Sequence, residues 1–101
     1  MKALCQAIRD QYTSDPINSP DYCRIVNDRH FKRVCDLLDS APNKKIIIGG
    51  DRNADAQYIG PTVVTGIGAE DKLMQEEIFG PILPILTVQS HQEAIDFINL
   101  R

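Results

Sequence analysis

Residues 75–81 read QEEIFGP, and the apolar run ILPIL follows at once at residues 82–86. A short continuous apolar run of this kind predicts a buried strand, as found in parallel sheets that are covered on both faces. Two adjacent carboxylates, Glu76 and Glu77, and one aromatic ring, Phe79, therefore stand directly before a buried strand. In α/β proteins, ligands bind where loops meet the ends of such strands. The placement of these side chains indicates a binding site.

Size and composition restrict the classes of protein to which this chain can belong. At 101 residues it forms at most one ordinary domain, and its 43% hydrophobic and 25% charged content is typical of a globular protein. A net charge of −3 without a cluster of Lys and Arg gives no reason to expect nucleic acid or an anionic membrane as a partner. The sequence has no apolar run near the roughly 20 residues of a membrane span and no apolar signal-peptide region. We therefore expect a protein made without a secretory signal, cytoplasmic or in the lumen of an organelle, and take cytoplasmic as the prediction.

The three cysteines do not form a recognisable disulfide or metal pattern. Cys5, Cys23 and Cys35 are odd in number and contain no CxxC pair, which favours reduced thiols. Cys23, His30 and Cys35 match the spacing of no common structural zinc site, so we expect no metal. Cys5 and Cys35 are expected to be half-buried structural thiols rather than nucleophiles, because no histidine or helix N-terminus stands near to lower their pKa.

Apolar residues at helical spacing predict three helices. The first covers residues 2–12 and has no capping side chain before it. The second begins at Asn27 or Asp28, either of which can cap it, and Pro42 stops it. The third follows a capping box that begins at Ser90. No Gly, Asn or Pro ends this last helix, so we expect the chain to be cut from something longer.

Short β-branched and apolar runs predict about three strands, over residues 44–48, 58–67 and 82–88. Pro61 makes the start of the second run an edge or irregular position. Strands flanked by helices indicate the α/β class, and we expect parallel pairing among strands that belong to a larger sheet. Apolar surface is expected to be exposed where further elements would dock.

Five stretches, taken in order and spacing, resemble the class 3 aldehyde dehydrogenases over nearly the whole chain. They are SPDY (19–22), RIVNDRHF (24–31), YIGPTVV (58–64), MQEEIFGPILPI (74–85) and EAIDFIN (93–99). The resemblance implies that residues 1–101 are an interior part of that family's catalytic domain. The complete enzyme would oxidise fatty or aromatic aldehydes to carboxylic acids with NAD or NADP, as a homodimer.

Within this resemblance, Glu77 corresponds to the glutamate that binds the ribose hydroxyls next to nicotinamide, and Phe79 to the aromatic that packs near the nicotinamide ring. A carboxylate suits the first role because it can accept two hydroxyl hydrogen bonds at once. In an extended segment the two side chains would project from the same side, as a shared ligand requires.

The family motifs that carry the chemical steps are absent from these 101 residues. The chain has no Gly-Gln-Thr-Cys-like nucleophile motif, no base-glutamate motif and no Gly-rich cofactor strand-turn-helix, so we expect no Rossmann domain and no catalytic residue here. Cys23 stands where class 3 sequences usually have glycine. We therefore expect the isolated chain to be catalytically inactive.

Alternative interpretations remain open at this point. Without the resemblance, Glu76 and Glu77 would be a solvated pair of loop charges, and Phe79 would be expected to pack in the core of the isolated chain. The competing functional hypothesis is a non-catalytic remnant that acts as an interaction module. It would pair with full-length subunits through strand edges or a helix face.

Overall fold

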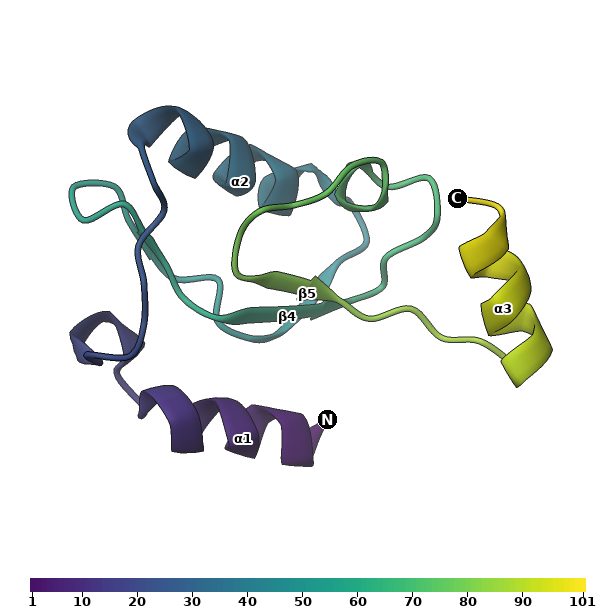
Figure 1. Cartoon of the computed structure of the whole chain (residues 1–101), viewed down its shortest axis with the longest axis horizontal. Helices are drawn as coiled ribbons and strands as arrows, with labels where there is room; N and C mark the ends of the chain where they lie inside the picture. The colour runs from purple at the N-terminus through teal and green to yellow at the C-terminus, as the bar shows by residue number, and fades with distance from the viewer.

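The computed structural model describes all 101 residues as helices on both faces of a small sheet (Figure 1). The α-helices are α1 (Lys2–Tyr12), α2 (Asp28–Ser40) and α3 (His91–Asn99). The strands are β1 (Lys45–Ile48), β2 (Arg52–Asn53), β3 (Tyr58–Ile59), β4 (Thr62–Thr65) and β5 (Ile82–Pro84). Two 3₁₀ turns, η1 (Pro16–Asn18) and η2 (Lys72–Met74), lie in the connections. The α/β class is confirmed.

The main sheet has three strands in the order β1-β4-β5. Strand β4 is central; it pairs antiparallel with β1, where Lys45 lies opposite Thr65, and parallel with β5, where Val63 lies opposite Leu83. A bulge between Ile46 and Ile48 shifts the register of the antiparallel pair. The expected parallel pairing therefore holds for β4 and β5, and the sheet as a whole is mixed.

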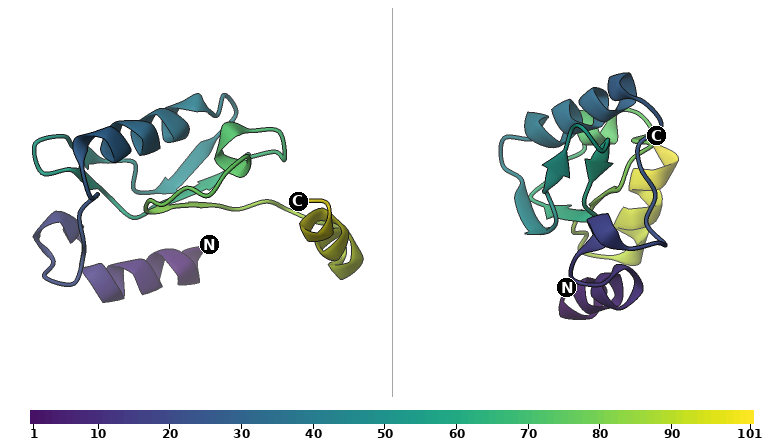
Figure 2. Two further views of the ribbon diagram at one scale, coloured as in Figure 1. Left: turned by 45° about the horizontal axis from the view of Figure 1, so that its top comes forward. Right: turned by 90° about the vertical axis from the view of Figure 1, so that its left-hand side faces the viewer.

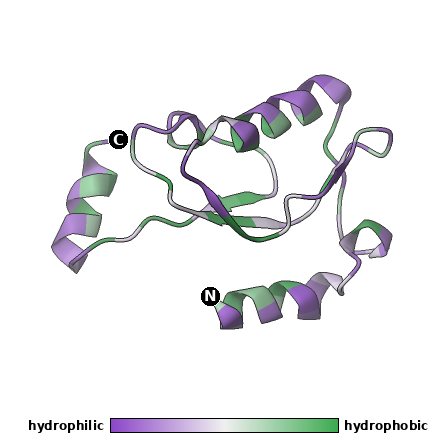
Figure 3. Ribbon diagram, turned by 180° about the vertical axis from the view of Figure 1, so that it is seen from behind, coloured by the Kyte–Doolittle hydropathy of each residue, from purple (hydrophilic) through white to green (hydrophobic).

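Helix α2 covers one face of the sheet and α1 lies along the other (Figure 2). Alternation along β4 explains how both faces are used: Val64 joins the core under α2, whereas Val63, also fully buried, belongs to the opposite face. The hydrophobic stripe of α2 faces the sheet in Figure 3. The core under α2 is a single cluster of ten residues, namely Val34, Cys35, Leu37, Leu38, Ala41, Ile59, Val64, Ile67, Leu73 and Ile82.

The strand expected over residues 58–67 is wrong as a single element. It is interrupted at Gly60 and Pro61, and the two parts belong to different sheets: β3 forms a hairpin with β2, and β4 joins the main sheet. Pro61 has no N–H to donate to a ladder. The Gly60 N–H donates to the Asp51 carbonyl at 2.8 Å. This bond connects the break between β3 and β4 to the residue that precedes β2. Strand β2 was not predicted from the sequence.

The strand expected over residues 82–88 is shorter than predicted and ends at Pro84. One further ladder bond, from the Ile85 N–H to the Val64 carbonyl at 2.8 Å, continues beyond it. Strand β5 then loses its partner because β4 ends at Thr65 and Gly66 turns the chain at φ 74°. An apolar run cannot form a strand where no neighbouring strand is left to pair with it.

Both expected helix caps are confirmed. Asn27 caps α2, its side-chain oxygen accepting from the His30 N–H at 2.9 Å. Ser90 caps α3 by accepting from the Glu93 N–H at 3.1 Å. The capping box is modified, since the Glu93 carboxylate accepts from the Gln89 N–H rather than from that of Ser90.

Cys5 and Cys35 are buried, more fully than the half-burial expected, and Cys23 is exposed; all three are free thiols. His, Cys, Asp and Glu side chains do not come together in any group of three that could hold a metal ion. None of the helices has the length and apolar character that crossing a membrane requires.

Candidate functional site

Residues 75–81 form a loop that leads from η2 into β5, and main-chain hydrogen bonds anchor its end. The Pro81 carbonyl accepts from the Thr62 N–H at 2.9 Å, and the Gly80 carbonyl accepts from the Ile82 N–H at 2.9 Å. Ile78 packs against the core, whereas Glu77 and Phe79 on either side of it are exposed. The loop therefore presents the two predicted site residues outward around one buried anchor.

Phe79 differs from both expectations for it. The residue is 72% exposed, so the expected core packing is wrong. Its φ of 53° lies in the left-handed region, so the segment is not extended as predicted. The reason lies with its neighbours: Ile78 takes the core position, and Gly80 packs so tightly on Val34 that a Cβ there would lie 2.7 Å from Val34 Cγ1.

The two adjacent glutamates have different environments. Glu76 forms an ion pair with Arg33, with an Nη1–Oε1 distance of 3.2 Å. Glu77 makes no hydrogen bond or ion pair in the structure, so both of its carboxylate oxygens are free to accept. Glu76 is thus a structural partner, and Glu77 is the carboxylate available to a ligand.

Two open hollows meet at Phe79. One, of about 470 Å³, is lined by Ile25, Val26, His30 and Phe79. The other, of about 310 Å³, is lined by residues of the connector before α2, by Ile59 and by the segment Phe79, Gly80 and Pro81. Apolar hollows with a few polar groups at their edge are typical of sites for ring-containing ligands.

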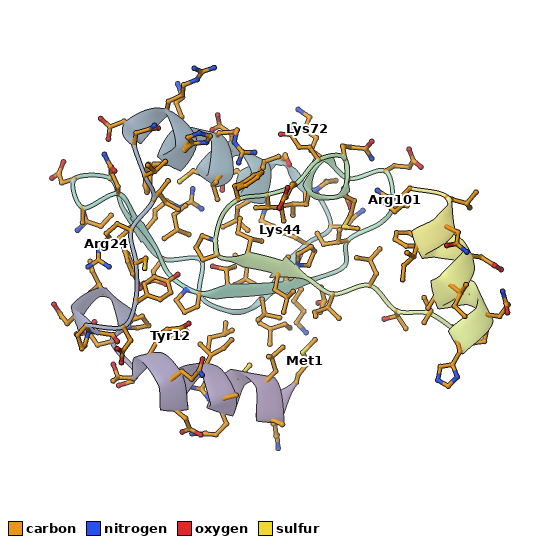
Figure 4. All side chains as sticks on the ribbon, viewed as in Figure 1. Met1, Tyr12, Arg24, Lys44, Lys72 and Arg101 are labelled. Atoms are coloured by element: carbon orange, nitrogen blue, oxygen red, sulfur yellow. The ribbon has the colours of Figure 1, made fainter.

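A cluster of tyrosines that was not predicted from the sequence lies beside the second hollow. The ring centroids of Tyr12 and Tyr22 are 5.0 Å apart, and those of Tyr22 and Tyr58 are 5.7 Å apart, both edge to face. The Tyr22 hydroxyl donates to the Ile59 carbonyl at 2.7 Å, and Arg24 lies 5.2 Å from the Tyr58 ring centroid. Tyr12 and Arg24 lie at the same end of the molecule in Figure 4.

Burial is the main cause of raised pKa values in this cluster. It raises the pKa of Tyr22 well above its usual range, and it raises the pKa of Tyr58 to about 12 together with the hydrogen bond to Asp51. The Tyr58 hydroxyl donates to Asp51 Oδ2 at 3.1 Å. Both hydroxyls therefore remain neutral donors near pH 7 and serve the packing of the connector rather than proton transfer.

Arg33 of α2, which was not predicted as a site residue, contacts the loop of residues 75–81. Its Nη1 donates to Glu76 and its Nη2 to the carbonyl of Ile78. These contacts span 43 and 45 residues of sequence. A local sequence pattern cannot predict these contacts. Helical periodicity indicates on which face of α2 Arg33 lies, but not which distant residues it meets there.

Comparison with known proteins agrees with this architecture. Aldehyde dehydrogenase, dimeric NADP-preferring, of Mus musculus is 46% identical over all 101 residues, and aldehyde dehydrogenase family 3 member A2 of Rattus norvegicus is 49% identical over the same length. The solved, substrate-bound Staphylococcus aureus AldH superposes with a TM-score of 0.93 at 48% identity over 99% of this chain. The chain spans only about a fifth of these proteins, covering 22%, 20% and 22% of their respective lengths. The model of the aldehyde dehydrogenase family matches residues 1–100, and this chain therefore belongs to that family.

Proposed function

We propose that this chain is part of the catalytic domain of an NAD(P)-dependent aldehyde dehydrogenase, in which Glu77 and Phe79 contact the nicotinamide half of the cofactor. The observation that carries the proposal is that Glu77, whose carboxylate is free, and Phe79 are both exposed on one loop in a chain of this family. The cofactor class is supported by the mouse relative, whose name describes it as NADP-preferring.

The side chains present fit the chemistry of this ligand. A carboxylate that makes no bond within the protein can accept from both hydroxyls of a ribose. The Phe79 ring and the apolar hollow lined by Ile25 and Val26 offer packing surface to a flat ring. Glu77 and Phe79 would orient the cofactor, which is a positioning contribution to the reaction.

When bound, NAD(P) supplies the acceptor for the hydride that leaves the aldehyde carbon. Cys5 and Cys35 are not placed to start that reaction, since both are buried within packed elements. We propose that the nucleophile and the base come from residues outside this segment and that the 101-residue chain is inactive by itself. The substrates would be fatty or aromatic aldehydes, and the whole protein would be cytoplasmic. It would form a homodimer, which the word "dimeric" in the mouse relative's name supports.

The test compares NADPH affinity of the full-length protein with and without the substitution Glu77→Gln, followed by nicotinamide fluorescence. The amide keeps the size of the side chain but loses its charge, so we expect roughly tenfold weaker binding or more. Glu70→Gln, another exposed loop carboxylate, serves as the control and should bind as the parent does. Unchanged affinity of the Glu77→Gln protein would contradict the assignment.

A second candidate function is an interaction module that pairs with complete dehydrogenase subunits. It is favoured by α3, which stands apart from the sheet (Figure 1). The helix exposes Ile95 and Ile98, and Leu100 just after it is exposed as well. Mixing the 101-residue chain with a full-length subunit and measuring co-elution tests this function. Separate elution at concentrations of tens of micromolar would exclude a useful affinity.

A further inference from the structure

We propose that Tyr22 is a positioning residue for cofactor binding, acting through the connector of residues 22–26. It attaches this connector to the hairpin of β2 and β3, and the connector carries Ile25 and Val26 into the wall of the hollow beside Phe79. Tyr22 does not itself line that hollow of about 470 Å³. The inference rests on the function proposed above, because the wall matters only if this hollow receives the nicotinamide ring.

The connector depends on other segments for its shape. Residues 22–26 contain no helix or strand. Val26 is 78% exposed and buries too little surface to hold the chain in place, and Ile25 is only partly buried against the core. The position of this wall is therefore set by whatever attaches the connector to the folded part of the molecule.

Two hydrogen bonds attach the connector to the hairpin. The Tyr22 hydroxyl donates to the Ile59 carbonyl at 2.7 Å, and the Ile25 N–H donates to the Gln57 carbonyl at 3.0 Å. Ile59 is the last residue of β3, and Gln57 immediately precedes this strand. Because the two bonds hold different points of the connector, they fix its direction as well as its position.

The Tyr22 ring is packed on two sides, which aims its hydroxyl at the hairpin. Its centroid lies 5.0 Å from that of Tyr12, the last residue of α1, and 5.7 Å from that of Tyr58 in β3. Both contacts are edge to face, a favourable arrangement for aromatic rings. The bond to Ile59 is partly buried, and a hydrogen bond out of water is stronger than an exposed one.

The connector and the loop of residues 75–81 face a common space. Tyr22 and Phe79 both line the hollow of about 310 Å³, and Ile25 lines this hollow as well as the larger one. A displaced connector would therefore change the shape of both hollows that meet at Phe79. A wall that is already in place reduces the ordering that ligand binding would otherwise require.

The hydroxyl of Tyr22 has a different task from that of Tyr58. Phenylalanine at position 22 could still pack between the neighbouring rings, but it has no donor for the Ile59 carbonyl. The Tyr58 hydroxyl donates to Asp51 Oδ2 at 3.1 Å, and this bond joins β3 to the residue before β2. Loss of the Tyr58 hydroxyl would therefore leave the connector attached.

The experiment uses Tyr22→Phe, which removes only the hydroxyl, and Tyr22→Leu, which also removes the ring, in the full-length protein. Tyr58→Phe is the matched control, because it removes a hydroxyl from the same cluster without touching the connector. The measurements are the KM for cofactor, the KM for aldehyde, the NADPH dissociation constant, and the amide hydrogen exchange of residues 22–26.

We expect Tyr22→Phe to raise the cofactor KM and the NADPH dissociation constant about fivefold, the effect of losing one typical hydrogen bond. Exchange should quicken at the Ile25 N–H, which depends on the same attachment, and the aldehyde KM should remain unchanged. Tyr22→Leu should give a larger loss of NADPH affinity. Tyr58→Phe should match the parent protein in all four measurements.

NADPH affinity equal to that of the parent in Tyr22→Phe would overturn the inference, and so would faster exchange at Ile25 without loss of affinity. Equal losses in Tyr22→Phe and Tyr58→Phe would also overturn it, because they would indicate a general loosening of the tyrosine cluster. If Tyr22→Leu does not fold, Tyr22→Phe carries the same comparison. Failure of the proposed function is distinguishable, since it would show as unchanged NADPH affinity in the Glu77→Gln protein.

Discussion

Gly80 shows how one missing side chain shapes the candidate site. Its Cα packs against Val34, whose side chain is 0% exposed, and a methyl group at this position would lie 2.7 Å and 2.9 Å from the two Val34 methyl carbons. Such distances are too short for carbon atoms, and Val34 has no free space into which it can move. The close approach of the loop to α2 therefore depends on glycine.

Replacement of Gly80 by alanine should lower the free energy of unfolding by roughly 1–3 kcal/mol, the usual cost of overpacking a core. The change is measured from the urea midpoint of the 101-residue chain. Gly68→Ala is the matched control, because its new Cβ would have Asp71 Oδ2 at 3.8 Å as its nearest neighbour. Equal losses for the two variants would show that Val34 does not oppose the added methyl group.

At the scale of elements, α2 and α3 share the same capping chemistry but differ in what they pack against. Both begin at a side chain that accepts from a main-chain N–H three residues later. Helix α2 carries Val34 and Leu38, both fully buried, whereas α3 has no buried residue. The cap of α2 therefore contributes to the stability of the whole core, and that of α3 only to its own helix.

This difference predicts separate outcomes for two cap deletions. Asn27→Ala should lower the free energy of unfolding by about 1 kcal/mol, since it removes the acceptor for the His30 N–H at the start of a core helix. Ser90→Ala should speed amide exchange within α3 and leave the urea midpoint unchanged, because α3 can open without opening the core. A shift of the midpoint by Ser90→Ala would mean that α3 is coupled to the core.

The elements that the sequence predicted correctly are those with a local signal of their own. The bounds of α1 agree with its apolar spacing, and Asn27 and Ser90 marked the starts of the other helices. Pro61 marked an irregular position in the run from Tyr58, but strand β2 and the division of that run between two sheets could not be predicted, because both arise from pairing between segments that meet only in the folded chain. At the site, the family resemblance pointed to Glu77 and Phe79, whereas the contacts of Arg33 with Glu76 and Ile78 exist only in the folded chain.

The molecule as a whole is less compact than its length would allow. Its radius of gyration is 14.4 Å, and its extents are 41 × 31 × 22 Å. A compact domain of 100 residues has a radius of gyration of about 13 Å. Part of the excess comes from α3, which projects from one end (Figures 1 and 2). Ile98 in this helix is 68% exposed, and Leu100 just after it is 87% exposed. An apolar helix face open to water favours association.

We expect the 101-residue chain to self-associate through this face, and Ile98→Lys to reduce the association. The measurement is the weight-average mass by sedimentation equilibrium over a range of concentrations. Asn99→Lys is the matched control, since it adds the same charge at the neighbouring exposed position without removing apolar surface. If both variants lower the mass equally, charge repulsion rather than the apolar face is responsible.

The sequence by itself determined the class of fold and the positions of the helices. These properties depend on spacing, capping and residue type within short segments, which act before distant parts of the chain meet. The tertiary structure alone decided that Phe79 faces outward, that the run from Tyr58 divides between two sheets, and that Arg33 contacts the loop. Each of these depends on which distant segment supplies the neighbouring atoms, and packing and pairing across the core select that neighbour.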